Sequence, residues 1–372
     1  MSGAIAAIDQ VTPTWLDGTL RRSGVLPRGR VVDVLAQPNA AFNSATWHLR
    51  VAYSEDAPAG APARLILKLN GVGAMAMRDG EREVAFYRLV APAATSLPML
   101  LHPYDAVYDP QGGKSHLLLA DLSETHVTPT DRARVLALDA VPTDPQLDGM
   151  VDAIAGFHAH WWQHPALGEG LLEMNGLYGS RASFDTYVRE TVASWASFIA
   201  VEGARFPVEL REIYEEVLSH LPALWERHLG RRIAARRNLT LCHGDCYFNN
   251  FLCPKAPDDG ATYIIDWQGP QVDFAARDLV YLFATFWTPA QRREGDRELR
   301  LLGRYHRALQ ARGVSEYGWD DLLLDYRLML VLRLFLPVWD AVHGASRGYW
   351  WPKLRCLADA FQDFGCAELV MV

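Results

Sequence analysis

The residues best suited to chemistry follow a short apolar run in the second half of the chain. The run Leu239–Cys242 leads into His243, Gly244 and Asp245, and Asn250 comes five residues later. In a tight turn, the carboxylate of Asp245 could accept the proton of an attacking hydroxyl group. The amide oxygen of Asn250 could reach a divalent cation held beside it. This spacing is typical of a general base next to a metal ligand.

A second carboxylate, Asp266, follows the β-rich run Tyr263-Ile264-Ile265 and would be presented at the end of a strand as the main Mg²⁺ ligand. Phe251-Leu252 would form the strand that returns toward Tyr263, with a polar turn over residues 255–260. Both acidic groups would then emerge from one hairpin. Transfer of a γ-phosphoryl group needs positioning, neutralisation of charge by a metal ion and one proton acceptor. The ordered combination predicts a phosphoryl-transfer site.

Each motif taken alone has a simpler interpretation. His-Gly-Asp at 243–245 could be an ordinary turn, and Ile-Asp-Trp at 265–267 could be an ordinary strand end. Chance matches to both motifs in the right order are much rarer than a match to either one. The combination therefore favours the functional interpretation.

These motifs carry a resemblance to a known family. His243-Gly244-Asp245 with Asn250, then Ile265-Asp266-Trp267-Gln268, then Asp278-Leu279, resembles the aminoglycoside phosphotransferase and choline-kinase-like superfamily, and within it the ecdysteroid-kinase-like branch. The resemblance implies an α+β, two-lobed protein-kinase-like fold. A β-rich, nucleotide-binding lobe would span residues 1–120, and a mostly helical lobe for catalysis and acceptor binding would span residues 121–372.

The resemblance also implies a role for each matching residue. Asp245 would be the catalytic base, and Asn250 and Asp266 would be the metal ligands, with ATP and Mg²⁺ as cofactors. The acceptor would be a hydroxyl group of a small molecule. His243 and Asp278 would support the catalytic loop, and an ordinary structural role is the main interpretation of both.

A nucleotide-binding hairpin is expected near the start of the chain. Val31–Leu35 and Trp47–Tyr53 are β-rich runs, and the segment 37–45 that joins them contains no glycine. This departs from the kinase pattern. Because many small-molecule kinases have a degenerate loop here, Asn43 and Ser44 remain candidate donors to the phosphates.

The next strand, residues 64–69, carries one lysine among aliphatic residues. Lys68 would share its face with Ile66, and a half-buried ammonium group there needs an anionic partner. Glu83, in a helix expected over residues 81–89, could supply it, and Glu81 is the alternative. The pair resembles the lysine and glutamate of the family, with Lys68 on the α- and β-phosphates. A solvated lysine at a sheet edge and a surface glutamate are the simpler interpretation.

The apolar strand His116–Leu122 ends in a polar break and, in this position, resembles the interlobe hinge of the family. Backbone groups of Ala120 and Leu122 would then bind the edge of adenine. Any buried strand that ends at an aspartate would look the same.

Composition excludes several classes of protein. The chain has 372 residues, is 50% hydrophobic and carries a net charge of -8, which argues against a nucleic-acid or anionic-membrane surface. Its first residues show no secretory signal, because no basic residue precedes the short apolar run. The longest apolar run, Leu328–Val338, is interrupted by Arg333 and is shorter than a membrane span. We therefore expect a cytoplasmic protein that binds neither nucleic acid nor membrane.

Three of the five cysteines lie near the catalytic stretch, at positions 242, 246 and 253, and with His243 they could suggest a zinc site. Their spacing is not that of paired Cys-x-x-Cys ligands, and Cys242 ends an apolar strand. Reduced, structural cysteines fit better.

The acceptor pocket is expected in the helical lobe. Ten of the twelve tryptophans come after residue 121, and an aromatic wall suits a partly apolar or ring-shaped acceptor. Arg333 and Asp340 lie among hydrophobic residues of a helix expected over 320–342, and they are candidate acceptor contacts. A buried salt bridge or a side chain that reaches solvent is the alternative for both. His158, in a helix expected over 146–162, is more typical of a packed core residue.

Two other functions compete with the small-molecule kinase. A protein kinase fits poorly, because glycine stands between His243 and Asp245 where arginine is expected, and residues 267–277 leave no room for an activation segment. A catalytically silent module that binds nucleotides or small molecules is the stronger rival, and the glycine-free segment supports it. The residues that argue against it are Lys68, Asp245, Asn250 and Asp266. Antibiotic, sterol-like, amino-alcohol and sugar acceptors all fit this core.

Overall fold

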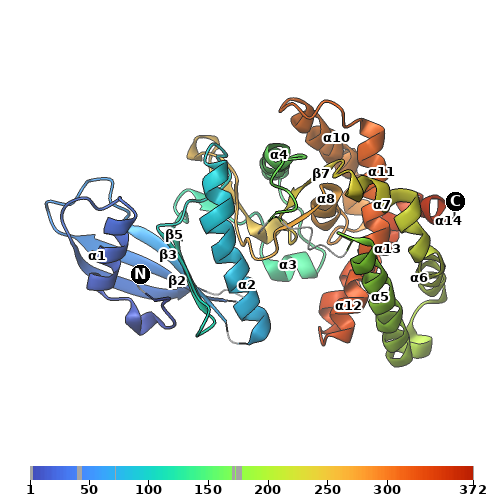
Figure 1. Ribbon diagram of the computed structural model, residues 1–372, viewed down its shortest axis with the longest axis horizontal. Helices are drawn as coiled ribbons and strands as arrows, with labels where there is room; N and C mark the ends of the chain where they lie inside the picture. Colours follow the sequence, from blue (N-terminus) through green and yellow to red (C-terminus); the bar gives the residue numbers. More distant parts are fainter. Residues whose placement is uncertain (1–2, 40–43, 72, 170–171, 173–177, 372) are drawn as a thin grey trace. The chain divides into compact units, whose positions relative to one another are not determined.

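The computed structural model describes residues 3–39, 44–71, 73–169, 172 and 178–371 (Figure 1). The chain forms two compact units. The first consists of Met1–Val127 and Pro254–Pro270, and the second consists of Thr128–Cys253 and Gln271–Val372. The segment that carries Asp266 therefore belongs to the first unit, although it comes late in the sequence.

The first unit is built on a five-stranded antiparallel sheet with the order β1-β2-β3-β5-β4. Its strands are β1 (Val31–Asn39), β2 (Ser44–Tyr53), β3 (Arg64–Asn70), β4 (Asp105–Asp109) and β5 (Lys114–Ala120). The described ends of the expected loop at 37–45 are strand, and Asn39 lies opposite Thr46. Pro38 is tolerated in β1 because β1 is an edge strand, where a missing N–H leaves no partner unsatisfied.

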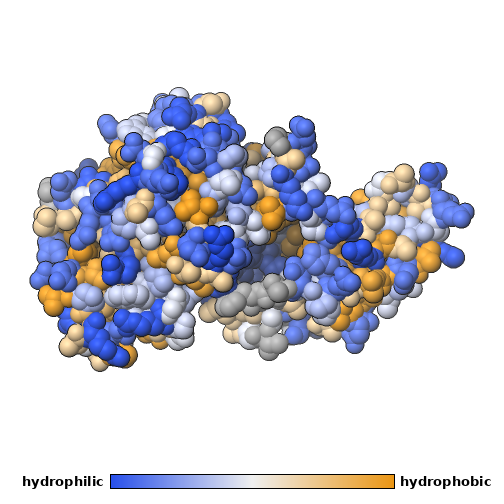
Figure 2. Space-filling view, turned by 180° about the vertical axis from the view of Figure 1, so that it is seen from behind, coloured by the Kyte–Doolittle hydropathy of each residue, from blue (hydrophilic) through white to orange (hydrophobic). Residues whose placement is uncertain are grey.

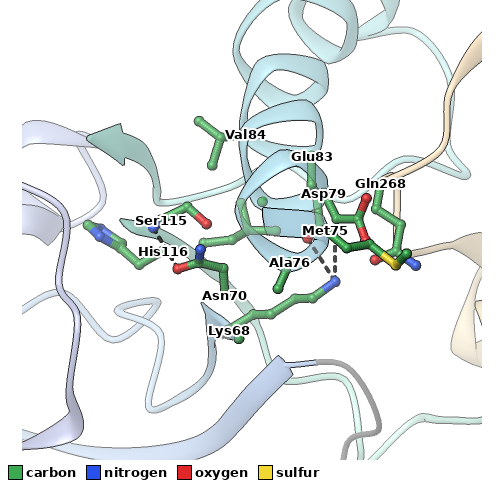
Figure 3. Close-up of a pocket in the computed structure, with 13 residues that line it drawn as sticks. Lys68, Asn70, Met75, Ala76, Asp79, Glu83, Val84, Ser115, His116 and Gln268 are labelled. Atoms are coloured by element: carbon green, nitrogen blue, oxygen red, sulfur yellow. Dashed lines mark hydrogen bonds and ion pairs between the residues drawn. The ribbon is translucent and has the colours of Figure 1, made fainter. Parts of the chain in front are cut away.

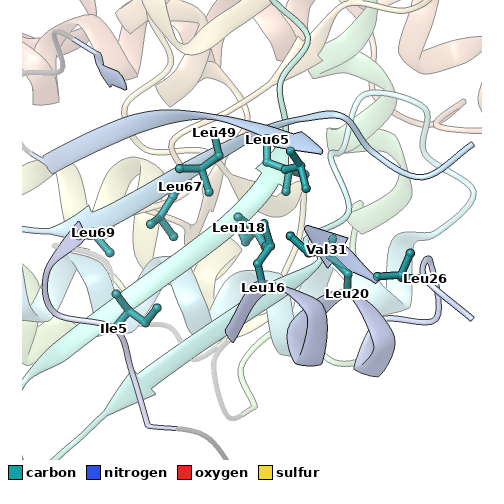
Figure 4. Packing of buried hydrophobic residues seen from close by; sticks show 11 residues of the cluster. Ile5, Leu16, Leu20, Leu26, Val31, Leu49, Leu65, Leu67, Leu69 and Leu118 are labelled. Carbon is teal, nitrogen blue, oxygen red and sulfur yellow. The ribbon is translucent and has the colours of Figure 1, made fainter. Parts of the chain in front are cut away.

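Helix α1 (Pro13–Arg22) covers one face of this sheet. Its N-terminus is capped by Thr12, whose side chain accepts a hydrogen bond from the backbone N–H of Trp15 at 3.2 Å. Its Leu16 and Leu20 are fully buried and belong to one apolar cluster with leucines of the sheet (Figure 4). The other buried members are Ile5, Leu26, Val31, Leu49, Val51, Leu65, Leu67, Leu69 and Leu118.

Helix α2 (Ala74–Ala85) packs against β3 and β5 on the opposite face. Side chains alternate along a strand, so β3 turns Leu65, Leu67 and Leu69 toward α1 and Lys68 toward α2. Gly80 lets the helix approach closely, because a Cβ there would collide with the Ser115 hydroxyl. The helix begins earlier than expected and continues as a π-helical turn, Phe86–Val90.

The second unit is mostly helical. Its helices are α3 (Arg132–Leu136), α4 (Asp144–Trp161), α5 (Arg181–Glu202), α6 (Val208–His220), α7 (Gly230–Ala234), α8 (Ala276–Phe283), α9 (Pro289–Arg293), α10 (Arg297–Gln310), α11 (Trp319–Arg333), α12 (Leu336–Val342), α13 (Arg347–Asp363) and α14 (Cys366–Met371). Short strands β6 (His126–Val127), β8 (Phe251–Pro254) and β9 (Tyr263–Ile264) lie near the points where the chain passes between units. The helix expected over 320–342 is divided in two, because Pro337 lies at the start of α12 and cannot continue the ladder of α11.

Two antiparallel strands position the His-Gly-Asp motif within this unit. They are β7 (Leu239–Cys242) and β10 (Gln271–Phe274), and Gln271 lies opposite Cys242. Helix α4 packs on β7, and α8 packs on α11. The His-Gly-Asp turn therefore leaves the end of a buried strand with helices around it.

No helix in the described parts of the chain is long and apolar enough to cross a membrane. On the face shown in Figure 2, hydrophilic residues predominate and hydrophobic residues gather in small patches. All five cysteines are buried free thiols, as expected for structural cysteines.

Candidate active site

A lysine held by two carboxylates lies at the centre of the first unit. The Lys68 ammonium on β3 is 2.7 Å from the nearer carboxylate oxygen of Glu83 on α2, and it also contacts Asp266, which follows β9. Burial by itself would lower the pKa of Lys68, but the negative charges of Asp266 and Glu83 outweigh that effect and raise it. The lysine is therefore charged at neutral pH. Glu81, the alternative partner, instead shares a hydrogen bond with Tyr108.

Asp266 has a backbone conformation that residues other than glycine rarely adopt. Its φ angle is 66°, in the left-handed region. The next residue, Trp267, is fully buried, and its indole N–H donates to the carbonyl of Ile264 at 3.0 Å. The Trp267 ring stacks on Phe86 at 4.1 Å between centroids. This packing holds the turn, and such strain commonly persists where a functional side chain must point in one direction.

A cavity of about 310 Å³ opens beside Lys68, between β3, β5 and α2 (Figure 3). Asp79 on α2 and Gln268, two residues after Asp266, line it. Burial raises the pKa of Asp79 despite the nearby arginines. The remaining wall is formed by Lys68, Asn70, Gly71, Met75, Ala76, Gly80, Glu83, Val84, Ser115, His116 and Leu117. The sequence interpretation missed Asp79, which belongs to no recognisable motif, and it gave Gln268 no role although Gln268 ends the Ile-Asp-Trp-Gln motif.

The expected phosphate-binding and hinge residues lie at strand ends. Ser44 begins β2 and lies opposite Asn70, whereas Asn43 lies outside the described residues. Ala120 is the last residue of β5. The carbonyl of Leu122 accepts hydrogen bonds from the N–H groups of Thr125 and His126, at 3.0 and 2.8 Å. Because the carbonyl of Leu122 already accepts these two hydrogen bonds, the backbone N–H of Leu122 is better suited than its carbonyl to bind a ligand.

In the second unit, a buried carboxylate shapes the His-Gly-Asp turn. Asp278 on α8 accepts hydrogen bonds from the backbone N–H groups of His243 and Gly244, at 2.6 and 2.9 Å. Gly244 has a φ angle of 85°, which a side chain would strain. The turn therefore depends on the glycine and on a carboxylate 34 residues away in sequence.

Asp278 is anchored in turn by His158 on α4, whose Nε2 lies 3.1 Å from the carboxylate. The other ring nitrogen of His158 lies 2.8 Å from the hydroxyl of Tyr305 on α10. Burial by itself would raise the pKa of Asp278, but the hydrogen bonds and charges around it lower it. His158 has no exposed surface, which confirms the expected packed position. Tyr305 was missed, because nothing in the sequence links it to this turn.

His158, Cys242 and Asp278 offer donor atoms within 4.8 Å of one another, a separation that suits a metal ion. Both nitrogens of His158 already lie within hydrogen-bonding distance of partners, and Asp278 accepts the loop N–H groups. Burial raises the pKa of the Cys242 thiol, and that thiol donates to the carbonyl of Phe274. A metal ligand must be a thiolate, so this cluster is better described as hydrogen-bonded core.

Asp245 and Asn250 are held together by the loop itself. The Asn250 amide nitrogen donates to the backbone carbonyl of Asp245 at 2.7 Å and lies 3.2 Å from its carboxylate. The N–H of Tyr247 donates to the same carbonyl at 3.1 Å. Because the amide nitrogen faces Asp245, the amide oxygen of Asn250 is the atom suited to a metal ion.

Aromatic rings continue from this loop into the helices. The Tyr247 ring lies 6.3 Å from that of Tyr281 on α8 and 6.0 Å from that of Phe286. Asp340 forms an ion pair of 2.9 Å with the buried Lys353, so the salt-bridge interpretation holds for this residue. Arg333 is buried as well, but its guanidinium lies over the ring of Tyr281 at 5.5 Å.

Comparison with known proteins supports the fold. The model of the ecdysteroid kinase-like family matches residues 76–313. The macrolide 2'-phosphotransferase of Brachybacterium faecium is 15% identical, with a TM-score of 0.50, over 92% of this chain and 97% of its own. A Plasmodium vivax ethanolamine kinase is 10% identical, with a TM-score of 0.53, over 90% of this chain and 85% of its own.

A GDP complex of an aminoglycoside 2'-phosphotransferase-IIIa variant is 13% identical, with a TM-score of 0.52, over 96% of this chain and all (100%) of its own. At these identities the likeness shows the fold alone, which is kinase-like, as expected from the sequence. No curated protein sequence matches the chain.

Proposed function

Since this chain belongs to the ecdysteroid kinase-like family, a family of small-molecule kinases, we propose that it transfers the γ-phosphoryl group of ATP to a hydroxyl group of a small molecule. The observation that carries the proposal is the lysine between two carboxylates, Glu83 and Asp266, in the nucleotide-binding unit. In phosphoryl transfer such a lysine binds phosphate oxygens and is positioned by the helix glutamate.

The first unit would bind the nucleotide. Lys68 reaches the α- and β-phosphates, and Glu83 keeps its ammonium group in position. Ser44, with Asn43, would donate to the phosphates. The backbone of Ala120 and the N–H of Leu122 would bind the edge of adenine.

Asp266 and Asn250 each offer an oxygen ligand of the kind that Mg²⁺ prefers. When bound, Mg²⁺ would neutralise the charge of the phosphates. The strained turn of Asp266 supports a ligand role, because that backbone directs one carboxylate and is held by the buried Trp267.

Asp245 would accept the proton of the acceptor hydroxyl. Its backbone carbonyl is held by Asn250 and Tyr247, so its position is set before the acceptor binds. The aromatic rings beyond it would pack against the body of the acceptor. Five buried free thiols suit a reducing compartment, which supports the expected cytoplasmic location.

A silent binding module remains the second candidate, because the segment 37–45 has no glycine to let backbone N–H groups surround a phosphate. A measurement of nucleotide turnover distinguishes the kinase from the silent binding module. We expect a slow, Mg²⁺-dependent release of ADP by the wild type without an acceptor, abolished in Asp245→Ala. Tight nucleotide binding with no turnover on any acceptor would favour the module.

The nucleotide site is tested first by thermal shift. ATP and GTP are titrated with and without Mg²⁺ against the wild type and Asp266→Ala. A Mg²⁺-dependent rise in melting temperature, lost in the variant, is the expected result. Asp258→Ala, which removes an exposed carboxylate from the turn before β9, is the control and should keep the full shift.

A further inference from the structure

The second unit contains a buried arginine that forms no salt bridge with any residue that the structure describes. Arg333, the last residue of α11, is only 7% exposed. Its Nε has no hydrogen-bond partner, and within the described residues the side chain forms no ion pair. Its guanidinium carbon lies 5.5 Å from the centre of the Tyr281 ring. A cation buried in this way is costly, and proteins normally pair it.

The surroundings of Arg333 increase this cost. Arg277 on α8 is also 7% exposed, and its charge, together with burial, lowers the pKa of Arg333, with burial the larger cause. Arg277 has partners of its own, because it lies 3.2 Å from the Asp273 carboxylate and 3.3 Å from the Tyr178 hydroxyl. The carboxylate of Asp273 forms its ion pair with Arg277, and the charge of Arg333 also acts to lower the pKa of Asp273, which burial raises, so one carboxylate faces two buried guanidinium groups.

Another buried cation of the same unit shows the contrast. Lys353 on α13 is 1% exposed, yet it lies 2.9 Å from the carboxylate of Asp340 and 3.7 Å from the centre of the Tyr349 ring. Lys353 therefore has a carboxylate partner, which Arg333 lacks among the described residues.

Arg333 is also close to the catalytic loop. Tyr247 comes two residues after Asp245, and its ring lies 6.3 Å from that of Tyr281, the ring on which Arg333 rests. Burial raises the pKa of Tyr281, and the charge of Asp245 raises it further, which also places Asp245 near this ring. A ligand that touches both Asp245 and Arg333 would lie along these two tyrosines.

We propose that Arg333 binds a carboxylate of the acceptor, so that the substrates are hydroxylated organic acids with a ring or apolar body. The planar guanidinium can donate two parallel hydrogen bonds to a carboxylate. The body of the acid packs on Tyr281 and Tyr247, and its hydroxyl group reaches Asp245. This inference rests on the proposed function for the role of Asp245, but carboxylate binding at Arg333 does not depend on turnover.

The test uses a panel of hydroxylated ring acids, beginning with para-hydroxymethylbenzoate, each paired with its primary amide. Binding is measured by calorimetry, and transfer is measured by mass spectrometry with ATP and Mg²⁺. We expect the wild type to prefer acid over amide by about tenfold in at least one pair, because a charge-assisted bidentate contact is lost in the amide. Arg333→Met should bind both members of that pair equally, and Arg333→Lys should keep part of the preference.

Stability separates this role from a structural one. Arg333→Met should raise the melting temperature, because it removes a buried charge that lacks a partner. The matched control is Arg292→Met, which removes a buried arginine paired with Glu298 and Asp363, and it should lower the melting temperature. A lower melting temperature for Arg333→Met would show that the charge is satisfied inside the protein and would overturn the proposal.

The binding results also separate the two proposals. No acid preference in any pair overturns the carboxylate site, even if uncharged acceptors are phosphorylated and the kinase function stands. An acid preference that depends on Arg333 without any transfer supports the carboxylate site and contradicts the proposed catalysis.

Discussion

The carboxylates of the two units differ in their exposure to solvent and in their hydrogen-bond partners. In the first unit, Glu83 and Asp266 share the ammonium group of Lys68, and the side chains of Lys68 and Asp266 are 20% and 28% exposed. In the second unit, Asp278 has no exposed surface, and it accepts backbone N–H groups while it contacts His158. The side chains of Lys68 and Asp266 thus keep part of their surface open to solvent. A group that only shapes a loop is saturated by the chain.

Replacing Asp245, the residue that the Asp278-shaped loop presents, should have the largest effect. Asp245→Asn should lower kcat by about 10²–10⁴-fold, because the proton acceptor is lost while the shape of the side chain is kept. Steady-state release of ADP with a working acceptor measures this. Unfolding in urea should be almost unchanged, so a variant that loses stability as well would contradict a purely chemical role.

Removing the saturated carboxylate should damage the fold itself. Asp278→Ala leaves two loop N–H groups and His158 without their acceptor, so we expect a loss of about 3–5 kcal/mol in the free energy of unfolding. Urea denaturation measures it. Asp139→Ala, at an exposed ion pair with Arg134, is the control and should cost about 0–1 kcal/mol. Equal costs for the two variants would refute the supporting role of Asp278.

The contributions of Asp278 and Lys68 to the stability of the protein should be lost at opposite ends of the pH scale. The pKa of Asp278 is lowered by folding, so its contribution is present above the unfolded pKa of about 4 and is lost as the pH falls. The pKa of Lys68 is raised, so its contribution is present below about 10.4 and is lost as the pH rises through the folded value.

This difference is measured as the stability gap between wild type and variant in urea at a series of pH values. The gap for Asp278→Asn should narrow below about pH 4, and the gap for Lys68→Met should narrow only above about pH 10.4. Gaps that narrow at the same end of the scale would show that the two clusters do not differ as described.

The smallest expected effect is at the helix partner of the lysine. Glu83→Gln leaves Lys68 in contact with Asp266 alone and should weaken ATP binding by about 1–3 kcal/mol, because a charged hydrogen bond that positions the ammonium is lost. Calorimetry with ATP and Mg²⁺ measures it. Glu81→Gln, two residues earlier on α2, is the control and should bind ATP like the wild type. An equal loss of ATP affinity in both variants would mean that the total charge of α2, and not the pairing of Glu83 with Lys68, determines ATP binding.

Much of the first unit could be predicted from local patterns. The capping Thr12, the alternation along β3 and the Lys68–Glu83 pair all depend on residues whose spacing determines which face they occupy. In the second unit, one continuous helix was expected over 320–342. The structure has two helices there, because Pro337 has no N–H group to continue the hydrogen bonds of α11.

The partners of the catalytic loop could not be predicted in the same way. The Tyr305 hydroxyl meets His158 across 147 positions of the chain, and no periodicity links two such residues. The sequence also could not predict that Arg333 has no described partner for its Nε. From the sequence, a buried salt bridge was the alternative interpretation of this residue.

The sequence by itself determined the order of chemical groups: a lysine and a glutamate, then His-Gly-Asp with its asparagine, then a strand-end aspartate. It also determined the family and the kinase-like fold. Only the tertiary structure decided that the segment of Asp266 belongs to the unit of Lys68, that Asp278 is saturated and that Arg333 forms no salt bridge with a described carboxylate. The reason is physical: residue spacing sets local geometry, whereas burial and charge compensation depend on contacts between distant segments.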